Sequence, residues 1–259
     1  MPFAKLPDVQ LYYEWSGPEN SPVLLFSNSL GTHLHMWDLQ LEEFTRHFRV
    51  LRYDTRGHGQ SGVSPGSYSI KQLGRDVVGL LDSLHIDRIH FCGLSMGGMI
   101  GMFLGANAAK RLNKLVLCNT AAKIGTAKTW NTRIQTVKKG GMKAVASGVI
   151  ERWLTPSYRS AHPATTQAAL AMLETANPKG YVACCAAVRD MDQRKSLSKI
   201  RVPCLVLTGA QDPVTPPTDA HFLTQHIPGA KYAEVPAAHL SNIEAREDFN
   251  RHVLQFLLA

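Results

Sequence analysis

The segment Gly93-Leu94-Ser95-Met96-Gly97 places a serine between two glycines, where the pattern of the chain changes. The apolar run 89–92 before it suits a strand, and the small and apolar residues 98–104 after it suit a helix. A sharp strand-to-helix turn has no room for larger side chains at the two glycines. The positive end of the helix would then point at Ser95, where an oxyanion would be stabilised. The sequence therefore predicts that Ser95 is a nucleophile on such a turn.

Short apolar runs alternate with helical patterns along most of the chain, which indicates an α/β fold with a mostly parallel sheet flanked by helices. Residues 9–15 alternate with period two and suit an outer antiparallel strand. The other expected strands are largely apolar on both faces, as buried parallel strands are: 23–26, 50–53, 89–92, 115–118, 204–207 and 232–235. Apolar stripes at helical spacing within 37–48 and 70–84 predict helices that cover the sheet.

The alternation stops after residue 122, because four helical stretches and no strand-like run follow up to about residue 194. Turn or helix-start signals punctuate this stretch at 140–141, 155–156, 162–163 and 177–180. We therefore expect a first part of the α/β core at 1–122, an inserted helical lid at 123–195 and a second part of the core at 196–259.

Composition limits the classes of function. The 259 residues are 44% hydrophobic, enough for a large core, and the formal net charge is +8. Lysines and arginines are spread without a block of five or six, which favours small anionic substrates over nucleic acid. The start of the chain lacks a secretory signal pattern, and no apolar run reaches the roughly 20 residues of a membrane span. We expect a soluble cytoplasmic protein without membrane or nucleic-acid partners, whose five cysteines are reduced thiols.

A nucleophilic serine needs a base, and the base needs an orienting acid. His239 follows the last expected strand and lies in a loop that could reach back to Ser95. Asp212 lies in a turn that follows the preceding strand, which gives the order serine, acid, histidine. These three residues are the predicted catalytic set.

The second half of an oxyanion hole is expected in the loop after strand 23–26. We assign the two donors to the backbone N–H groups of Leu30 and Met96. The side chains of Asn28 and Ser29 would brace this loop or contact substrate.

Taken together, these segments resemble the α/β-hydrolase superfamily. The resemblance covers the whole chain and includes 93–97, 209–212, 238–239 and the loop 53–61, which is structural in such proteins and receives no catalytic role here. It implies an α/β-hydrolase fold with the lid inserted after the sixth strand. Within the superfamily, 28–31, 119–125, 140–142 and 238–244 are similar to the 3-oxoadipate enol-lactonases of the β-ketoadipate pathway.

That similarity implies a serine hydrolase that opens a small anionic enol-lactone through an acyl-enzyme, in the breakdown of aromatic compounds and without a metal or other cofactor. Trp130 and Arg133, three residues apart on one face of the first lid helix, are the expected substrate contacts: Arg133 for the carboxylate and Trp130 as a wall. The alternatives with the same catalytic residues are an arylesterase, a cofactor-free perhydrolase, a carbon–carbon bond hydrolase and a small-molecule receptor. Ser95 argues against dehalogenases and epoxide hydrolases, which use a carboxylate at that position. The oligomeric state is left open, with a homo-oligomer among the options.

Overall fold

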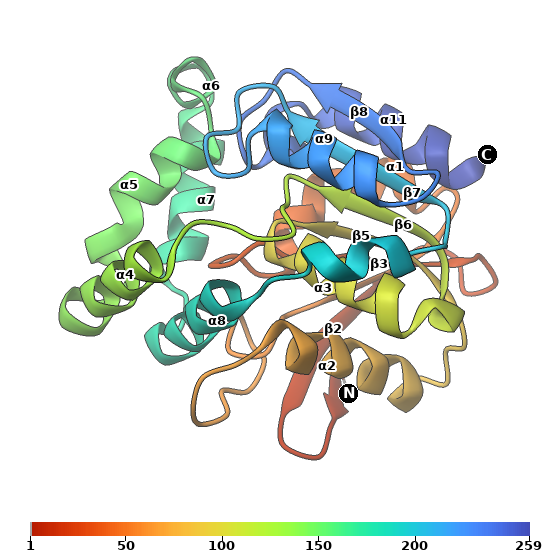
Figure 1. Ribbon diagram of the computed structural model, residues 1–259, viewed down its shortest axis with the longest axis horizontal. Helices are drawn as coiled ribbons and strands as arrows, with labels where there is room; N and C mark the ends of the chain where they lie inside the picture. The colour runs from red at the N-terminus through yellow and green to blue at the C-terminus, as the bar shows by residue number, and fades with distance from the viewer. Residues whose placement is uncertain (1) are drawn as a thin grey trace.

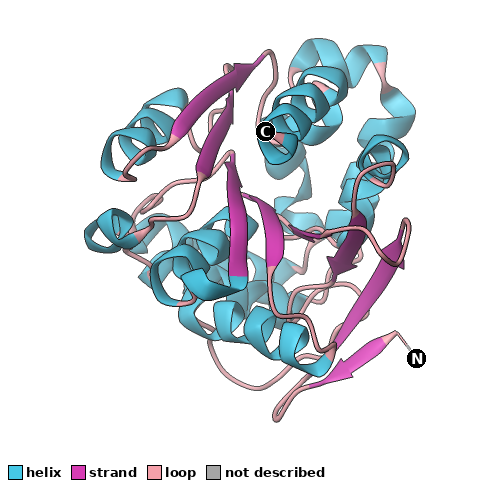
Figure 2. Cartoon of the chain, turned by 90° about the vertical axis from the view of Figure 1, so that its right-hand side faces the viewer, coloured by secondary structure: helices cyan, strands magenta, loops and turns pink. Residues whose placement is uncertain are grey.

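The computed structural model of the protein describes residues 2–259, which form one twisted eight-stranded sheet with helices on both faces (Figures 1 and 2). The strand order across the sheet is β1-β2-β4-β3-β5-β6-β7-β8. The strands are β1 Phe3–Lys5, β2 Gln10–Ser16, β3 Val23–Ser27, β4 Arg49–Tyr53, β5 Ile89–Leu94, β6 Leu112–Cys118, β7 Cys204–Gly209 and β8 Lys231–Val235.

The sheet is parallel from β4 to β8, whereas β2 pairs antiparallel with both β1 and β4. The expected α/β class is thereby confirmed, as is the outer antiparallel strand. The three-residue strand β1 was not expected, because a segment this short carries no readable alternation. Parallel pairing places the carboxyl ends of β3, β5, β6, β7 and β8 along one edge, and the segments that follow these strands carry the predicted site residues.

Helices cover both faces of the sheet. One face carries α2 Ile70–Ser83, α3 Met96–Asn107, the 3-10 helix η3 Arg194–Lys199 and α9 Pro217–His226. The other carries α1 Asp38–Phe44, which follows η1 Leu34–Trp37, together with α10 Ser241–Glu244 and α11 Arg246–Leu258. A further 3-10 turn, η2 Ala109–Arg111, leads into β6.

Helix α2 shows how the sequence sets these elements. Ser69 caps its first turn by accepting a hydrogen bond from the backbone N–H of Gln72. Its apolar stripe, including Leu73, Val77 and Leu80, is fully buried against the sheet. The stripe predicted from the sequence thus forms the face that packs on the core.

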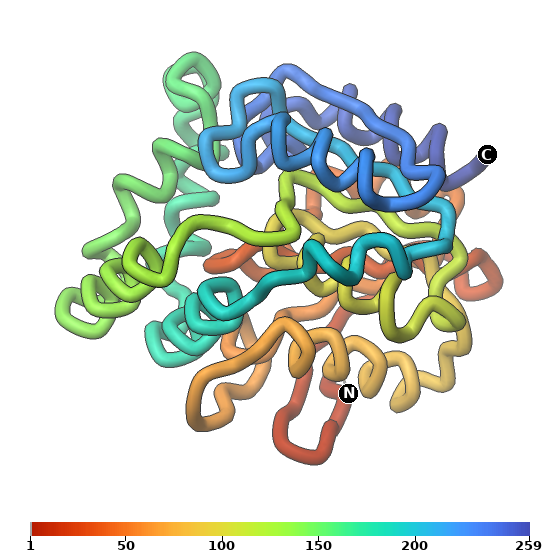
Figure 3. The backbone as a smooth tube through the Cα atoms, viewed as in Figure 1, coloured from red at the N-terminus to blue at the C-terminus, as the bar shows by residue number. Residues whose placement is uncertain are grey.

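Five helices occupy the stretch between β6 and β7 and lie to one side of the sheet, in green to teal in Figure 3. They are α4 Ala127–Gly140, α5 Lys143–Trp153, α6 Pro156–Ala161, α7 Pro163–Glu174 and α8 Pro178–Asp190. The sequence predicted four helical stretches here. The fifth arises because His162 leaves the helical conformation and Pro163 begins a new helix at its first position.

Within residues 2–259, no helix is long and apolar enough to span a bilayer. All five cysteines are buried free thiols, as expected.

Candidate active site

The turn that carries Ser95 joins β5 to α3, as predicted. Ser95 has φ 57° and ψ −114°, a strained conformation for a residue other than glycine. A Cβ atom on Gly93 would lie 2.3 Å from the carbonyl oxygen of Gly97, and one on Gly97 would lie 2.2 Å from that of Ser27. The close approach of these backbones therefore requires both glycines. The Ser95 N–H donates to the Cys118 carbonyl at 2.9 Å, which ties the turn to β6.

Asp212 and His239 lie in the loops that follow β7 and β8. The Nδ1 atom of His239 is 2.8 Å from Oδ2 of Asp212, and both residues are buried, with exposed fractions of 2% and 3%. An ionised carboxylate at this position keeps the proton on Nδ1 and leaves Nε2 as the basic nitrogen.

Asp212 accepts four further hydrogen bonds besides that of His239. Its Oδ2 accepts from Asn119 Nδ2 at 2.9 Å and from the Thr215 hydroxyl at 2.8 Å, and its Oδ1 accepts from the N–H groups of Val214 and Thr215. Burial opposes ionisation of this carboxyl, but the charge and hydrogen bond of His239, with the bonds from Asn119 and Thr215, hold its pKa below the usual value. The carboxylate is thus built to stay ionised.

Ser95 and His239 line the same small cavity, of about 30 Å³, at the carboxyl edge of the sheet. No hydrogen bond joins the Ser95 hydroxyl to the His239 ring within residues 2–259. Catalytic hydrogen bonds are often long without substrate and tighten in the complex. The geometry therefore places nucleophile and base candidates at one cavity, with the final contact unmade.

The N–H groups of Leu30 and Met96 are the two donors expected for an oxyanion, and both residues line this cavity. Their neighbours are bonded: the Ser29 N–H donates to Met36 Sδ and the Gly97 N–H to the Asn28 carbonyl. Within the described part of the chain, neither the Leu30 nor the Met96 N–H has a protein acceptor. Two unpaired donors beside Ser95 are what an oxyanion site requires.

Trp130 and Arg133 also line the cavity, as expected of substrate contacts. Arg133 Nε donates to the Tyr181 hydroxyl at 2.7 Å, and its guanidinium lies 5.4 Å from the ring centres of both Trp130 and Tyr181. These contacts orient the guanidinium while leaving its other N–H groups for an anion. Trp153, the last residue of α5, is buried and lines the cavity as well.

Arg152 is a pocket residue that sequence reasoning missed. It lines the inner cavity and also an outer hollow of about 680 Å³ between α4, α5 and residues 213–214. Desolvation and the positive charge of Arg133 lower the pKa of Arg152. Both arginines line the inner cavity and the outer hollow, so two cations face one entrance. The only signal in the sequence was a second neighbouring arginine and tryptophan, at 152–153, one helix after Trp130 and Arg133.

Asn28 and Ser29, the other two residues predicted to contact substrate or brace the loop, differ in their positions. Ser29 lines the cavity. Asn28 is fully buried and does not, because its amide donates to the Tyr53 carbonyl at 2.7 Å and accepts from Trp37 Nε1 at 3.0 Å. Its position corrects the prediction of substrate contact and corresponds to the bracing alternative.

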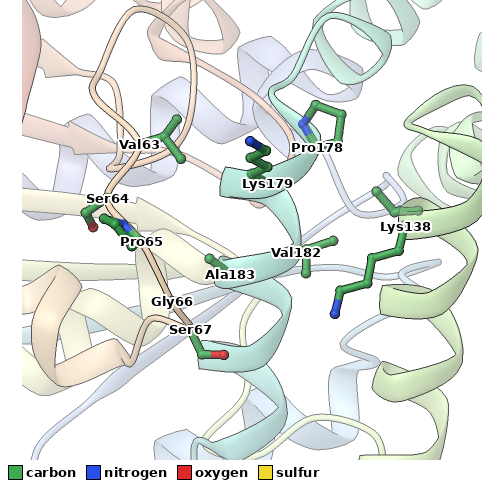
Figure 4. A pocket seen from close by; sticks show the side chains of 11 residues that line it. Val63, Ser64, Pro65, Gly66, Ser67, Lys138, Pro178, Lys179, Val182 and Ala183 are labelled. Atoms are coloured by element: carbon green, nitrogen blue, oxygen red, sulfur yellow. The ribbon is translucent and has the colours of Figure 1, made fainter.

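A larger hollow of about 710 Å³ lies elsewhere, between residues 63–67, α4 and α8 (Figure 4). Its rim carries Lys138 and Lys179, and its lining contains none of the predicted site residues. In the described residues no group of three or more histidine, cysteine or acidic side chains is arranged to hold a metal ion. Ser95, His239, Leu30 and Met96 line the small cavity instead.

Residues 22–246 match the family described as the alpha/beta hydrolase fold. The chain belongs to this family, as the resemblance in its sequence implied.

Within this family, the chain is similar to several enol-lactonases. The chain is 42% identical to 3-oxoadipate enol-lactonase 2 of Acinetobacter baylyi, over 95% of this chain and 92% of that protein. It is 39% identical to 3-oxoadipate enol-lactonase 1 of the same organism, over 90% and 88%. The crystal structure of the enol-lactonase from Burkholderia xenovorans LB400 superposes with a TM-score of 0.98 at 42% identity, with all of both chains covered.

Proposed function

We propose that this protein is a serine hydrolase that opens the ring of 3-oxoadipate enol-lactone to give 3-oxoadipate, in the breakdown of aromatic compounds. The observation that carries the proposal is the single cavity that Ser95, His239, Leu30, Met96 and Arg133 share. A nucleophile, its base, two oxyanion donors and a cation for a carboxylate are the groups that this reaction needs. The similarity to enol-lactonases over nearly the whole chain supports the choice of substrate.

In the proposed reaction His239 Nε2 takes the Ser95 proton as Oγ attacks the lactone carbonyl. The oxyanion accepts hydrogen bonds from the N–H groups of Leu30 and Met96, each worth roughly 2.7–4 kcal/mol in the transition state. Collapse breaks the ring C–O bond and expels an enolate, which takes up the proton held by the His239 imidazolium and becomes the 3-oxo group, so that His239 is neutral again. His239 then activates a water molecule, which hydrolyses the acyl-enzyme and releases the acid.

The enolate leaving group is stabilised by resonance, so proton donation from His239 matters less for ring opening than with an ordinary alkoxide. The function of His239 as a base is needed in both steps. Asp212 stays ionised and stabilises the imidazolium without taking its proton.

The substrate carries a free carboxylate, and Arg133 is the proposed partner for it. Its guanidinium is oriented by Tyr181 and Trp130, and it can bind a carboxylate in a bidentate manner. Arg152, which faces both the cavity and the outer hollow, is placed to attract the anion during entry. Trp130 forms a wall of the cavity.

Residues 123–195 are the proposed lid between the two parts of the core, 1–122 and 196–259. Trp130 and Arg133 of α4 and Arg152 of α5 line the inner cavity of about 30 Å³ together with Ser95, so these helices cover the site. The carbonyl of Trp153 at the end of α5 accepts from the N–H of Leu240, next to His239. This bond ties the end of α5 to the loop that carries His239.

A substrate panel tests the proposal. Purified protein is assayed with the enol-lactone, with 4-nitrophenyl acetate, with a dienoic ring-cleavage acid, and for perhydrolysis of acetate with hydrogen peroxide. We expect the highest kcat/KM for the enol-lactone. A higher value for any other substrate would overturn the proposed function in favour of the corresponding esterase, carbon–carbon hydrolase or perhydrolase. Binding of the lactone without turnover would indicate a receptor instead.

A further inference from the structure

His58 is a buried histidine outside the proposed catalytic set, and it contacts the loop that supplies the Leu30 donor. Its Nε2 accepts a hydrogen bond from the Gly31 N–H at 3.0 Å, and its exposed fraction is 1%. Gly31 has φ 85°, a conformation that favours glycine, and directly follows Leu30. His58 thus holds the residue next to an oxyanion donor.

The hydrogen bonds of His58 define its tautomer. An imidazole nitrogen can accept only when it carries no proton, so acceptance at Nε2 requires the proton on Nδ1. Nδ1 lies 3.4 Å from the Arg56 carbonyl, which can accept that proton. Sγ of Cys184 on α8 is 3.9 Å from the same nitrogen. The ring therefore bridges the 54–59 loop and the oxyanion loop only in its neutral form, protonated at Nδ1.

The support behind His58 is rigid. The Arg56 guanidinium binds the carboxylates of Asp8 and Asp76 and the Ser64 hydroxyl. Gly57 packs against the backbone of α8, where an added Cβ atom would lie 2.7 Å from Cα of Gly180. The ring is thus fixed by the core on one side and by the inserted helices on the other.

The charged and titratable groups that face His58 are few. His33 opposes a positive charge on the ring, and Cys184 lies beside Nδ1. The Tyr181 ring of α8 lies 6.5 Å away, and the Arg56 side chain points to its own carboxylates. Burial, with the charge of His33, lowers the pKa of His58 to about 4, although its bond to the Arg56 backbone acts in the opposite sense. The ring therefore remains neutral over the range in which hydrolases of this type are assayed.

We propose that neutral His58 is a positioning residue that holds the loop 28–31 through Gly31, so that the Leu30 N–H stays directed at the oxyanion. The inference rests on the proposed function and adds a residue of the 54–59 loop to the machinery of the reaction. A neutral acceptor is needed because a protonated ring would present a donor to the Gly31 N–H.

The test compares His58→Leu, which keeps bulk without an acceptor, with His58→Gln, whose Oε1 can reach the position of Nε2. Removal of one oxyanion donor costs about 10²–10³-fold in kcat, and loosening the loop should cost less, so we expect His58→Leu to lose about 10–100-fold. KM for the lactone should stay unchanged, and His58→Gln should recover most of the activity. Inhibition by a trifluoromethyl ketone, which forms an oxyanion on Ser95, should weaken in His58→Leu in parallel with kcat.

His90→Leu is the matched control. His90 lies near the start of β5, at the opposite edge of the sheet from Ser95, and packs against Phe48 at 5.4 Å between ring centres. This variant should retain the wild-type kcat. A kcat of His58→Leu equal to that of His90→Leu, or a His58→Gln variant as slow as His58→Leu, would overturn the proposal.

Two further readouts keep the result decisive. If His58→Leu fails to fold, the nitrogen chemical shifts of His58 in the wild type report the tautomer: a proton on Nδ1 supports the proposal and a proton on Nε2 overturns it. All variants are assayed on both the enol-lactone and 4-nitrophenyl acetate. If the wild type hydrolyses the ester and not the enol-lactone, the proposed function is refuted, and the role of His58 is still tested on the ester. If the wild type hydrolyses the enol-lactone and His58→Leu has the same kcat, only this inference is refuted.

Discussion

Asn119, the first residue after β6, donates from Nδ2 to Oδ2 of Asp212 at 2.9 Å and thereby joins the ends of two neighbouring strands. Nδ2 of Asn119 also lies 3.2 Å from the Ala238 carbonyl oxygen, and Oδ1 of Asn119 accepts a hydrogen bond from the Ser241 hydroxyl at 2.5 Å. Asn119 thus links the loop of Asp212 to the loop of His239. Its φ of 45° is that of a strained residue that the surrounding bonds hold in place.

Replacing Asn119 by alanine should lower kcat for the enol-lactone by about tenfold, equivalent to ~1.4 kcal/mol, with little change in KM. Asp212 would lose one of its donors, and the His239 imidazolium would be less well supported in the transition state. Steady-state kinetics measure the effect. Asn107→Ala is the control, because Asn107 is exposed at the end of α3 and its side-chain amide donates to the Phe103 carbonyl within the same helix. Equal kcat values for the two variants would contradict this role of Asn119.

Residues that follow a motif or a strand end in the chain were predictable, and contacts between loops were not. The two glycines around Ser95, and the order of Ser95, Asp212 and His239, can be read from the sequence because each follows its own apolar run. The bond from Asn119 to Asp212 depends on β6 and β7 being neighbours in the sheet, and no local sequence pattern predicts that pairing. The role of Asn119 therefore became visible only in the structure, whereas Thr215 lies three residues after Asp212 in the same turn.

The inserted helices show the same limit. Trp130 and Arg133 share one helix face, so their common position followed from spacing alone. Arg152 belongs to the next helix, and its approach to Arg133 depends on how α4 packs on α5. The boundary at His162 was marked by Pro163, yet periodicity alone did not separate α6 from α7.

Arg133→Met should raise KM for the anionic lactone by about 10–100-fold, since a hydrogen bond to a charged group is worth roughly 1.5–3 kcal/mol. Methionine keeps much of the apolar stem that packs near Trp130 and removes the charge. Hydrolysis of neutral 4-nitrophenyl acetate serves as the internal control and should change little. An equal loss on both substrates would mean that Arg133 is not the carboxylate partner.

Arg152→Met should act on the rate of substrate capture. A cation at the entrance attracts the anionic lactone, and salt screens this attraction over about 10 Å at 0.1 M ionic strength. We expect wild-type kcat/KM to fall with added salt and the variant to start lower with a flatter salt dependence. A variant with the wild-type salt dependence would exclude steering by Arg152.

Gly97→Ala should destabilise the fold by about 1–3 kcal/mol or prevent folding, because its Cβ atom would collide with the Ser27 carbonyl. Gly148→Ala is the matched control: it lies inside α5, where the nearest atom to an added Cβ, on Arg152, is 3.7 Å away. That change should be neutral or stabilise by up to ~1 kcal/mol, since alanine is the better helix former. Thermal or urea unfolding measures both, and equal stabilities would refute the steric reason for Gly97.

His58 should make stability depend on pH between about 6.5 and 4. Its pKa falls from 6.5 in the unfolded chain to about 4 in the fold, so in this range the unfolded state binds a proton that the folded state does not. The contribution of His58 to the free energy of unfolding should thus be fully present above pH 6.5. It should decrease as the pH falls towards 4 and below, by up to about 3 kcal/mol. His58→Gln should lose less stability than the wild type on acidification. The exposed His47→Gln variant should follow the wild type, and parallel curves for all three proteins would contradict the assignment.

The assignment of Ser95 as the nucleophile that opens the enol-lactone is tested most directly by the loss of lactone ultraviolet absorbance with wild type and with folded Ser95→Ala. The account predicts rapid loss with the wild type and a rate at least about 10⁴-fold lower with the variant, because the variant lacks the hydroxyl that forms the acyl-enzyme. Comparable loss of absorbance with both proteins, or none with the wild type, would contradict it.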